Sequence, residues 1–210
     1  MPAERVVSQP IMHTDALVLR AQTGDAHAQG RLMQLWYRRI YNFSYKFFFD
    51  HDQAMEATQK TFIAMFRNLV QLQEPARFKS WLYTIAVNCC REELRKRKAS
   101  RSLSLDELTG SEGEHSGAWQ QSDRRHDNPD RVLQQHELSD LLQTCLQELS
   151  EEQRVVVIMK EYEGLKFREI AEALGTSENT VKSRLYYGLD TLKKILERKN
   201  ITKATIGYEI

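Results

Sequence analysis

The sequence has few of the features that mark secreted, disulfide-bonded or membrane proteins. Its 210 residues include three cysteines, four prolines and nine glycines, and three cysteines are too few for a disulfide framework. The mean hydropathy is −0.58, and no segment approaches the roughly 20 consecutive apolar residues of a membrane-spanning helix. The first ten residues contain Glu4 and Arg5 and no apolar run, so we expect no signal peptide. We therefore expect a cytoplasmic protein with no membrane insertion, and the low proline and glycine content favours helices over a sandwich or barrel.

Motifs of catalysis and metal binding are also missing from the sequence. It has no HExxH, no GxSxG and no glycine-rich phosphate loop. Cys89 and Cys90 lack CxxC spacing, so a buried structural role is the better interpretation, with a redox or zinc switch as the alternative. Glu92 and Glu93 are adjacent on an expected helix and therefore point apart. We expect no enzymatic activity, no catalytic residues, no cofactor and no metal site.

The charge is unevenly distributed, although the net charge is only +1. Residues 1–98 carry a net charge of +6, residues 99–130 one of −4, and residues 131–210 one of −1. Within the last block, residues 137–179 have four basic and ten acidic groups, and residues 180–203 have seven basic and two acidic groups. This asymmetry predicts two kinds of partner, at least one of them polyanionic.

The hydrophobic pattern predicts an all-α protein with two small helical domains. We expect the first domain at residues 15–98 and the second at residues 131–198, with a tail at residues 199–210. Between them, residues 99–130 are rich in serine, glycine and acidic residues and have little apolar periodicity. They are predicted to form a flexible acidic linker, and a solvated spacer without further role is an equally open interpretation.

Three helices are expected in the first domain. Apolar residues recur at three- and four-residue steps from Leu17 to Trp36, and Asp50 can cap the next helix. That helix has one predicted apolar stripe: Met55, Thr58, Phe62, Met65, Phe66 and Leu69. Pro75 separates it from a third helix, which runs from about Lys79 to a basic end at Lys98.

The segment from Phe167 to Leu185 has the pattern of a helix-turn-helix. Ile170, Ala171 and Leu174 form the predicted buried side of its first helix. Gly175 supplies the turn, and Ser177 can cap the second helix. An ordinary helical hairpin is the alternative, but the turn, the cap and the small Ala171 all agree with the DNA-binding motif.

The outer face of the second helix combines polar and basic side chains. Val181, Leu185, Gly188 and Leu192 share its predicted buried face. The candidate DNA-binding residues on the other side are Asn179, Thr180, Lys182, Ser183, Arg184, Tyr186 and Tyr187. A recognition helix needs such a face, since polar groups read base edges and cations contact phosphates.

A second candidate nucleic-acid signal joins aromatic and basic residues. Phe78, Trp81 and Tyr83 precede Asn88 and a basic run that ends at Lys98. Aromatic side chains can stack on unpaired bases, and a cationic track can follow the backbone. Taken alone, this signal is weak, because aromatic residues at helical spacing more often belong to the core.

Four segments in order resemble the extracytoplasmic-function class of bacterial sigma factors in the sigma-70 family. Residues 52–62 resemble region 2.2, residues 78–88 the melting segment 2.3, and residues 91–98 region 2.4. Residues 149–185 resemble region 4. The resemblance covers roughly residues 15–98 and 131–197, and the order of the segments is more specific than any one of them.

The resemblance implies a non-enzymatic subunit that binds the core RNA polymerase and promoter DNA. Core-binding residues would be Glu56, Gln59, Lys60 and Ile63. Residues that melt and hold the single-stranded −10 element would be Arg77, Phe78, Trp81, Tyr83, Asn88, Arg91, Arg95 and Lys96. The helix-turn-helix would read the duplex −35 element. The resemblance further implies an anti-sigma partner that packs the two domains together.

The sequence departs from the family at several positions. Lys60 stands where the family usually has an acidic residue, and Glu92 where it usually has aspartate. Tyr186, Tyr187 and Leu189 replace a stretch that is typically rich in arginine and lysine. Fewer phosphate contacts should flatten the salt dependence of DNA binding. The alternative function is a stand-alone helix-turn-helix regulator, which would bind duplex DNA tightly without polymerase.

Overall fold

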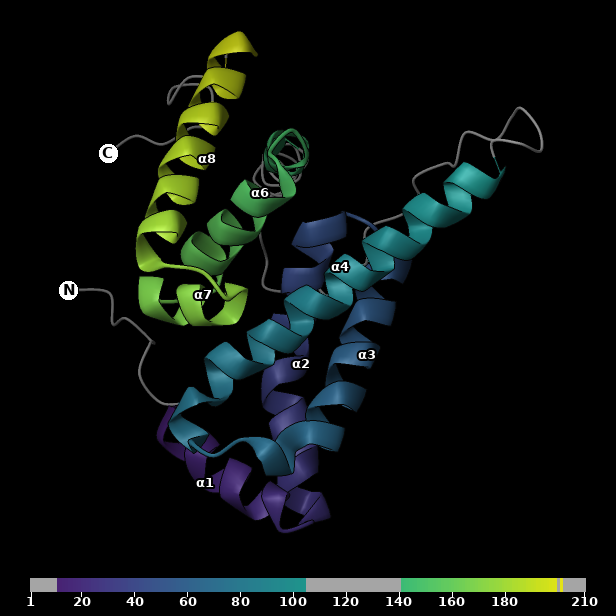
Figure 1. The fold of residues 1–210 in the computed structure, drawn as a ribbon, viewed down its shortest axis with the longest axis vertical. Coiled ribbons are helices and arrows are strands. Elements are labelled where there is room, and N and C mark those ends of the chain that lie inside the picture. Colours follow the sequence, from purple (N-terminus) through teal and green to yellow (C-terminus); the bar gives the residue numbers. More distant parts are fainter. Residues whose placement is uncertain (1–10, 105–140, 200, 202–210) are drawn as a thin grey trace, which may run out of the picture.

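The computed structural model describes residues 11–104, 141–199 and 201, and every regular element in these residues is a helix (Figure 1). This confirms the all-α class. The bounds of the first domain are α1 Ile11–Gln22, α2 Ala26–Phe48, α3 His51–Asn68 and α4 Phe78–Ser104, with 3-10 turns at Leu69–Gln71 and Pro75–Arg77. Residues 141–147 are helical. They are followed by α6 Glu151–Val157, a π-helical turn Ile158–Tyr162, α7 Phe167–Leu174 and α8 Glu178–Arg198.

Helices α1 to α4 form the first bundle, and local caps define where its helices begin. The Asp25 carboxylate accepts hydrogen bonds from the backbone N–H groups of His27 and Ala28 at the start of α2, at 2.9 and 3.1 Å. The Asp50 carboxylate accepts one from the N–H of Gln53 at 3.0 Å, which confirms the predicted cap of α3. Such caps satisfy backbone donors that have no partner inside the helix.

Aromatic rings from α2 and α4 fill the centre of this bundle. The Trp36 and Phe78 rings meet edge to face with centroids 5.6 Å apart, and those of Phe43 and Tyr83 do so at 5.5 Å. Phe78 and Tyr83 have no exposed surface. Both rings therefore belong to the core of this arrangement, and contact of these two side chains with DNA stays a prediction.

Two predictions in the first domain need correction. Helix α4 does not end at Lys98 but continues through Ser104, into the segment assigned to the linker. On α3, Met55 was expected in the apolar stripe, but its side chain is 45% exposed. Ala54, Ala57 and Thr61 are buried instead, together with the predicted Thr58, Phe62 and Met65. The rest of the predicted linker and all but Lys199 and Ile201 of the tail lie outside the described residues.

The second domain packs α6, α7 and α8 around a close contact. Ser150 caps α6 in a reciprocal capping box with Gln153. Gly188 of α8 lies so close to α6 that a Cβ atom there would be 3.1 Å from Cγ2 of Val157. The absence of a side chain at Gly188 thus allows α6 and α8 to pack closely.

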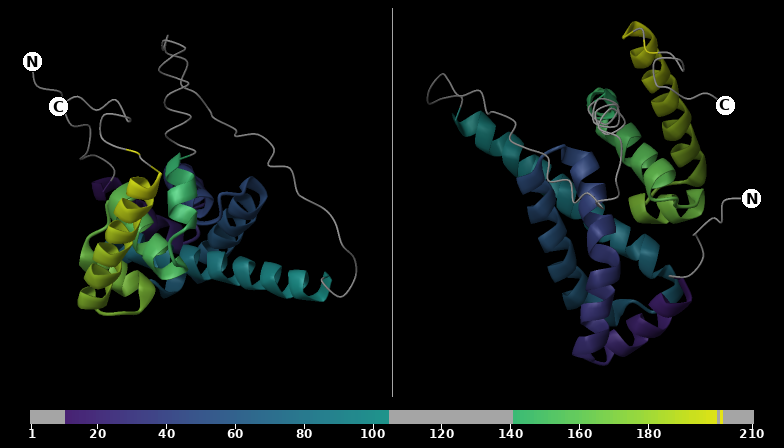
Figure 2. Two further views of the ribbon diagram at one scale, coloured as in Figure 1. Left: turned by 90° about the horizontal axis from the view of Figure 1, so that it is seen from above. Right: turned by 180° about the vertical axis from the view of Figure 1, so that it is seen from behind.

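The two domains pack against each other, with α7 lying on the N-terminal half of α4 (Figures 1 and 2). The C-terminal half of α4 projects beyond both bundles. Buried apolar side chains form one continuous cluster that extends from α1 to α8. None of the helices in the described parts of the chain is long and apolar enough to cross a membrane.

Candidate polymerase-binding groove and DNA-binding surfaces

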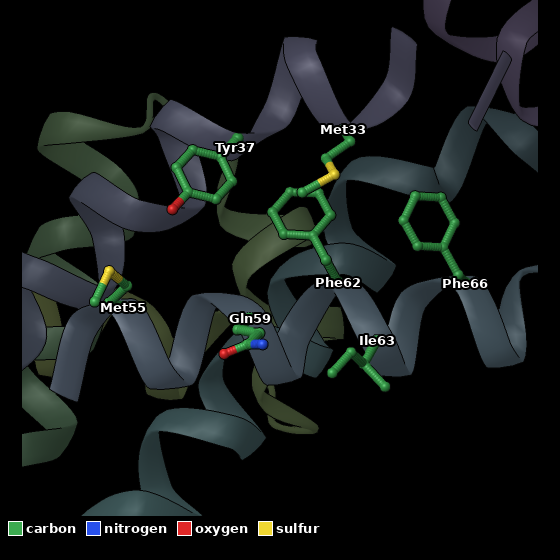
Figure 3. A pocket seen from close by; sticks show the side chains of 7 residues that line it. All are labelled: Met33, Tyr37, Met55, Gln59, Phe62, Ile63 and Phe66. Carbon is green, nitrogen blue, oxygen red and sulfur yellow. The ribbon is translucent and has the colours of Figure 1, made fainter. Parts of the chain in front are cut away.

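An open apolar groove lies between α2 and α3 (Figure 3). Its volume is about 360 Å³, and its lining residues are Met33 and Tyr37 of α2 and Met55, Gln59, Phe62, Ile63 and Phe66 of α3. Met33, Tyr37, Met55 and Ile63 are 39–45% exposed. Exposed methionine and aromatic side chains gathered in one groove are typical of a surface that binds an apolar helix of another protein.

The structure brings the four predicted core-binding residues together on α3. Gln59 and Ile63 line the groove, and Glu56 and Lys60 lie next to them on the exposed side of the helix. Their contact with polymerase stays a prediction. The sequence analysis missed the groove residues of α2, because Met33 and Tyr37 stand one position away from the buried Leu32 and Trp36. The signal that could have identified them is their three- and four-residue spacing outside the buried stripe.

Lys60 is held by two carboxylates. Its ammonium group lies 2.9 Å from Oε1 of Glu56 on the same helix and donates a hydrogen bond to Glu93 of α4. The hydrogen bond to Glu93, with that to Glu56, raises the pKa of Lys60. The basic residue at a position that is usually acidic thus connects α3 to α4.

The remaining residues of the predicted −10 surface follow α4 and the turn before it. Asn88, Arg95 and Lys96 are exposed, and Trp81 and Arg91 are half-buried. The Trp81 ring packs beside Phe78 with centroids 6.0 Å apart. The exposed groups form a polar and basic side of α4, and their contact with DNA stays a prediction.

Acidic residues of the second domain bind several groups on this surface. The Arg77 guanidinium donates a hydrogen bond to Oε1 of Glu172 at 2.8 Å, and the Ser80 hydroxyl donates one to Oε2 of the same carboxylate at 3.1 Å. The hydrogen bond from Arg77 is the main cause that lowers the pKa of Glu172. The Tyr83 hydroxyl donates a hydrogen bond to Glu163 at 2.5 Å, and burial, with the nearby Glu163 carboxylate, raises the pKa of Tyr83.

Two more contacts continue this interface. The Arg91 guanidinium donates a hydrogen bond to Oε1 of Glu151 at 3.0 Å, and Arg154 of α6 donates one to the Phe47 carbonyl of α2, also at 3.0 Å. Nothing in the sequence pairs these particular residues. The only available signal was the excess of acidic groups in residues 137–179.

The helix-turn-helix has the predicted geometry. Gly175 adopts a left-handed conformation with φ of 61° at the end of α7, which favours glycine. The Ser177 hydroxyl accepts a hydrogen bond from the Thr180 N–H at 3.1 Å and caps α8. Ile170, Ala171, Val181, Leu185 and Gly188 are buried as predicted. The predicted Leu174 and Leu192 are only partly buried, and Ala173 and Ile195 are buried in addition.

The outer face of α8 is open. Asn179, Ser183, Tyr186 and Tyr187 are exposed, and the two tyrosines are 67% and 68% exposed. Thr180, Lys182 and Arg184 are half-buried. The Arg184 guanidinium is 3.3 Å from a carboxylate oxygen of Glu152, so one predicted phosphate contact has a partner in the free chain. Contact of this face with DNA stays a prediction.

The described residues contain no group of three or more histidine, cysteine or acidic side chains that could hold a metal ion. Cys90 is buried, and its thiol lies 3.6 Å from the Ser44 hydroxyl. Burial raises the pKa of Cys90 to about 12. The expectation of a buried structural role therefore holds for Cys90, whereas Cys89 is half-buried.

A two-domain helical protein with a helix-turn-helix and an exposed apolar groove defines a class of DNA-binding proteins that also bind another protein. Comparison with known families is more specific. The family description "Sigma-70 region 2" matches residues 32–100, and "Sigma-70, region 4" matches residues 139–192. The chain belongs to the extracytoplasmic-function class of the sigma-70 family and is an RNA polymerase sigma factor, a subunit that directs promoter-specific initiation.

Individual relatives agree with this assignment. The chain is 26% identical over 184 residues to the RNA polymerase sigma-H factor of Pseudomonas aeruginosa, covering 86% of this chain and 92% of that protein. It is 27% identical over 179 residues to the ECF sigma factor SigW of Bacillus subtilis, covering 85% and 94%. The fold resembles that of the sigma factor RpoE from Bartonella quintana, solved with the anti-sigma factor NepR, with a TM-score of 0.61, 22% identity and coverage of 80% of this chain and 96% of that one.

Proposed function

We propose that the chain binds core RNA polymerase through the α2–α3 groove, reads the duplex −35 element with α8, and melts and holds the −10 element along α4. The observation that carries this proposal is the presence of two sigma regions in one chain, with an exposed apolar groove on region 2 and an exposed outer face of α8 on region 4. The stand-alone regulator predicted as an alternative leaves region 2 and its groove without a role. The subunit has no enzymatic activity of its own and acts in the cytoplasm.

The groove supports a protein partner rather than a small ligand. It is open along its length, and its exposed side chains come from two antiparallel helices (Figure 3). Glu56 and Lys60 add charge at its edge, which favours specific orientation of a docked helix. An anti-sigma protein is proposed as a second partner of this chain, since the Bartonella relative was solved with one.

Core binding is tested by one substitution in the groove and one outside it. Ile63→Glu places a carboxylate in the groove, at a side chain that is 44% exposed. Val70→Glu makes the same kind of change at a side chain that is 73% exposed and does not line the groove. We expect Ile63→Glu to weaken binding to purified core polymerase at least tenfold, because a charge must then be buried against an apolar partner.

Promoter-directed transcription is the matching functional measurement. Purified chain and core polymerase transcribe a genomic fragment library, and the 5′ ends are mapped. We expect discrete starts that require the chain and share sequences near −35 and −10, with Val70→Glu active and Ile63→Glu inactive. Unchanged core binding by Ile63→Glu would contradict the proposed groove. Failure of the wild-type chain to redirect core, beside an active control sigma factor, would contradict the proposed function.

A further inference from the structure

The outer face of α8 carries two adjacent tyrosines that are largely exposed. Tyr186 is 67% and Tyr187 68% exposed. Within the described residues, neither side chain makes a hydrogen bond or a contact with another ring. A tyrosine offers a large apolar ring with a polar tip at a low cost in conformational entropy, so exposed tyrosines on a binding face are suited to contact a partner. Packing within the chain does not explain this pair.

Both rings flank the part of α8 that is expected to enter the major groove. Ser183 precedes Tyr186 by three residues and Tyr187 by four, so it lies between them on the same face. Asn179 lies one turn earlier on this face. We name Asn179, Ser183, Tyr186 and Tyr187 the reading strip. At about 1.5 Å per residue the strip is about 12 Å long, which corresponds to roughly four base pairs.

The cations of α8 lie beside the reading strip or are paired. The Lys182 ammonium lies over the Phe167 ring of α7, 5.6 Å from its centroid. The Arg184 guanidinium is 3.3 Å from a carboxylate oxygen of Glu152. The other cations of α8 pair with carboxylates: Lys193 with Glu197, Lys194 with Asp190 and Arg198 with Glu148. The reading strip itself therefore contains aromatic and neutral polar side chains and no cation.

This composition fits A·T base pairs better than G·C base pairs. Guanine presents two acceptors, N7 and O6, in the major groove, and arginine or lysine is the usual residue that reads them. Thymine presents a C5 methyl group, which is read by apolar contact, and asparagine can read adenine. The reading strip offers two rings and Asn179 but no cation. Of the four base edges, the methyl edge of thymine is thus the one that the two rings match.

We propose that Tyr186 and Tyr187 read the C5 methyl groups of thymines in the −35 element and determine the sequence preference of this chain. The inference rests on the proposed function, which assigns α8 to the −35 duplex, and it names the base that α8 reads. Each ring packs against a methyl group that is exposed in the free major groove, so apolar surface of both partners is removed from water. A neutral ring replaces no counterion of the DNA, so these contacts add specificity without adding salt dependence.

The test uses a duplex probe that does not depend on transcription. Duplexes with about ten random base pairs are enriched on the full chain, once alone and once with core polymerase. Each thymine of the enriched duplex is then replaced in turn by deoxyuridine, which keeps the base pair and removes only the methyl group. Fluorescence anisotropy at fixed salt measures the affinity of the wild type, Tyr186→Ala, Tyr187→Ala and a control, Leu189→Ala. Leu189 is 40% exposed on the same helix but lies outside the reading strip.

We expect thymine at fixed positions of the enriched duplexes. Removal of one contacted methyl group should weaken wild-type binding about fourfold, as the transfer of a single methyl group into water predicts. At that position Tyr186→Ala or Tyr187→Ala should bind the thymine and deoxyuridine duplexes equally, whereas Tyr186→Phe, Tyr187→Phe and Leu189→Ala should keep the difference. The phenylalanine variants retain the ring, so they distinguish the methyl contact from any role of the hydroxyl group.

A basic residue in the strip should change the preference. Tyr187→Arg places a guanidinium where the ring of Tyr187 stands. We expect the base enriched at the position read by Tyr187 to change from thymine to guanine. The slope of log affinity against log salt should become steeper by about one unit if the new cation also contacts a phosphate. An unchanged base preference would contradict contact of Tyr187 with a base.

Four results would overturn the proposal. The first three are a pool that stays random in both enrichments, deoxyuridine without effect at every thymine in the wild type, and a methyl effect that both alanine variants retain. The fourth is weaker binding of Tyr186→Ala or Tyr187→Ala to core polymerase in the absence of DNA, which would assign the tyrosines to a protein contact.

Transcription separates this inference from the proposed function. If the wild-type chain redirects core polymerase but no thymine methyl group affects its affinity, only the thymine reading is wrong. If the methyl effect depends on Tyr186 or Tyr187 but the chain does not redirect core polymerase, the proposed function is wrong and the thymine reading stands.

Discussion

Single side chains connect neighbouring helices at a few defined positions, and Lys60 is one of them. The Glu93 carboxylate that it contacts is only 14% exposed, and the next cation, Lys96, lies 3.5 Å from it. Removal of the Lys60 ammonium group would leave Glu93 largely buried with a weaker partner. Buried acceptors that lose a donor cost about 1–3 kcal/mol.

We therefore expect Lys60→Ala to lower the free energy of unfolding by about 1–2 kcal/mol, measured by urea denaturation at pH 7. The matched control is Lys194→Ala. Lys194 pairs with Asp190 on the surface of α8, and the two side chains are 69% and 55% exposed. Exposed pairs of this kind contribute little to stability, because solvent screens them. Equal losses for the two variants would show that the Glu93 contact does not stabilise the bundle.

Cys90 offers a second test at the scale of one residue. Burial raises the pKa of its thiol to about 12, above the value of 9.0 for a free thiol. The contribution of Cys90 to stability is therefore complete below pH 9 and is lost as the pH rises through 12, because the unfolded thiol ionises first. Between these values the native thiol stays protonated and the unfolded thiol does not.

We expect iodoacetamide at pH 9 to alkylate Cys90 at least tenfold more slowly than the half-buried Cys89 in the native chain. Peptide mass spectrometry distinguishes the two sites. In guanidinium chloride the two rates should become equal. Equal rates in the native chain would mean that Cys90 is accessible and would contradict its structural role.

At the scale of elements, the fit of α8 against α6 depends on Gly188. A Cβ atom there would lie 3.1 Å from Val157 Cγ2 and 3.4 Å from Gln153 Cβ. Val157 is buried and β-branched, so it has little freedom to move away. Gly30 of α2 is the opposite case, because a Cβ atom there meets nothing within 4 Å.

We expect Gly188→Ala to lower the free energy of unfolding by about 1–2 kcal/mol, since crowding outweighs the gain in helix propensity. Gly30→Ala should raise it by about 0.5–1 kcal/mol, because only the propensity changes. Val157→Ala combined with Gly188→Ala should recover part of the stability that Gly188→Ala loses. Thermal denaturation of all these variants measures the changes. Stabilisation by Gly188→Ala alone would show that α6 and α8 can move apart to accommodate the methyl group without a loss of stability.

The elements that the sequence predicts well are those with local signals. Gly175 and Ser177 define the turn of the helix-turn-helix to within a residue or two, since a left-handed glycine and a hydroxyl cap act over a few positions. The end of α4 at Ser104 was missed because a serine-rich composition resembles a linker. The burial of Tyr83 could not be read from the sequence, because helical spacing alone does not distinguish a buried aromatic side chain from an exposed one.

The surface between the domains could not be predicted in the same way. The partners Arg77 and Glu172 are 95 residues apart, and no local pattern relates them. Segment charge indicated an acidic and a basic face but not that they meet within one chain. The α2–α3 groove was predicted in part, through Gln59 and Ile63, because the family resemblance covers α3 more specifically than α2.

For the whole molecule, salt distinguishes charge pairing from apolar packing as the interaction that holds the two domains together. Arg77 and Arg91, which form ion pairs with Glu172 and Glu151 of the second domain, are 49% and 33% exposed, so added ions can screen these pairs. The Debye length falls from about 10 Å to about 3 Å between 0.1 and 1 M NaCl. Apolar contacts are not weakened by this change.

We therefore expect the radius of gyration of the wild-type chain to increase between 0.1 and 1 M NaCl. A variant with Glu151→Gln, Glu163→Gln and Glu172→Gln lacks the carboxylates that contact the first domain, so it should be expanded at both concentrations and change little. Scattering at several protein concentrations excludes association as the cause. A wild-type radius that stays constant or decreases with salt would show that apolar packing, and not the ion pairs between the domains, keeps the two domains together.

The open groove has a consequence for what can separate the two packed domains. A ligand that binds two conformations with equal affinity does not alter their ratio, however tightly it binds. Met33, Tyr37, Met55 and Ile63 of the groove are exposed while the two domains are packed together, so a partner that touches only these side chains favours neither the packed nor the separated form. Such a partner would bind the chain while its two domains remain packed against each other. The work of separating the domains must come from a second contact, either with region 4 or with the covered side of α4.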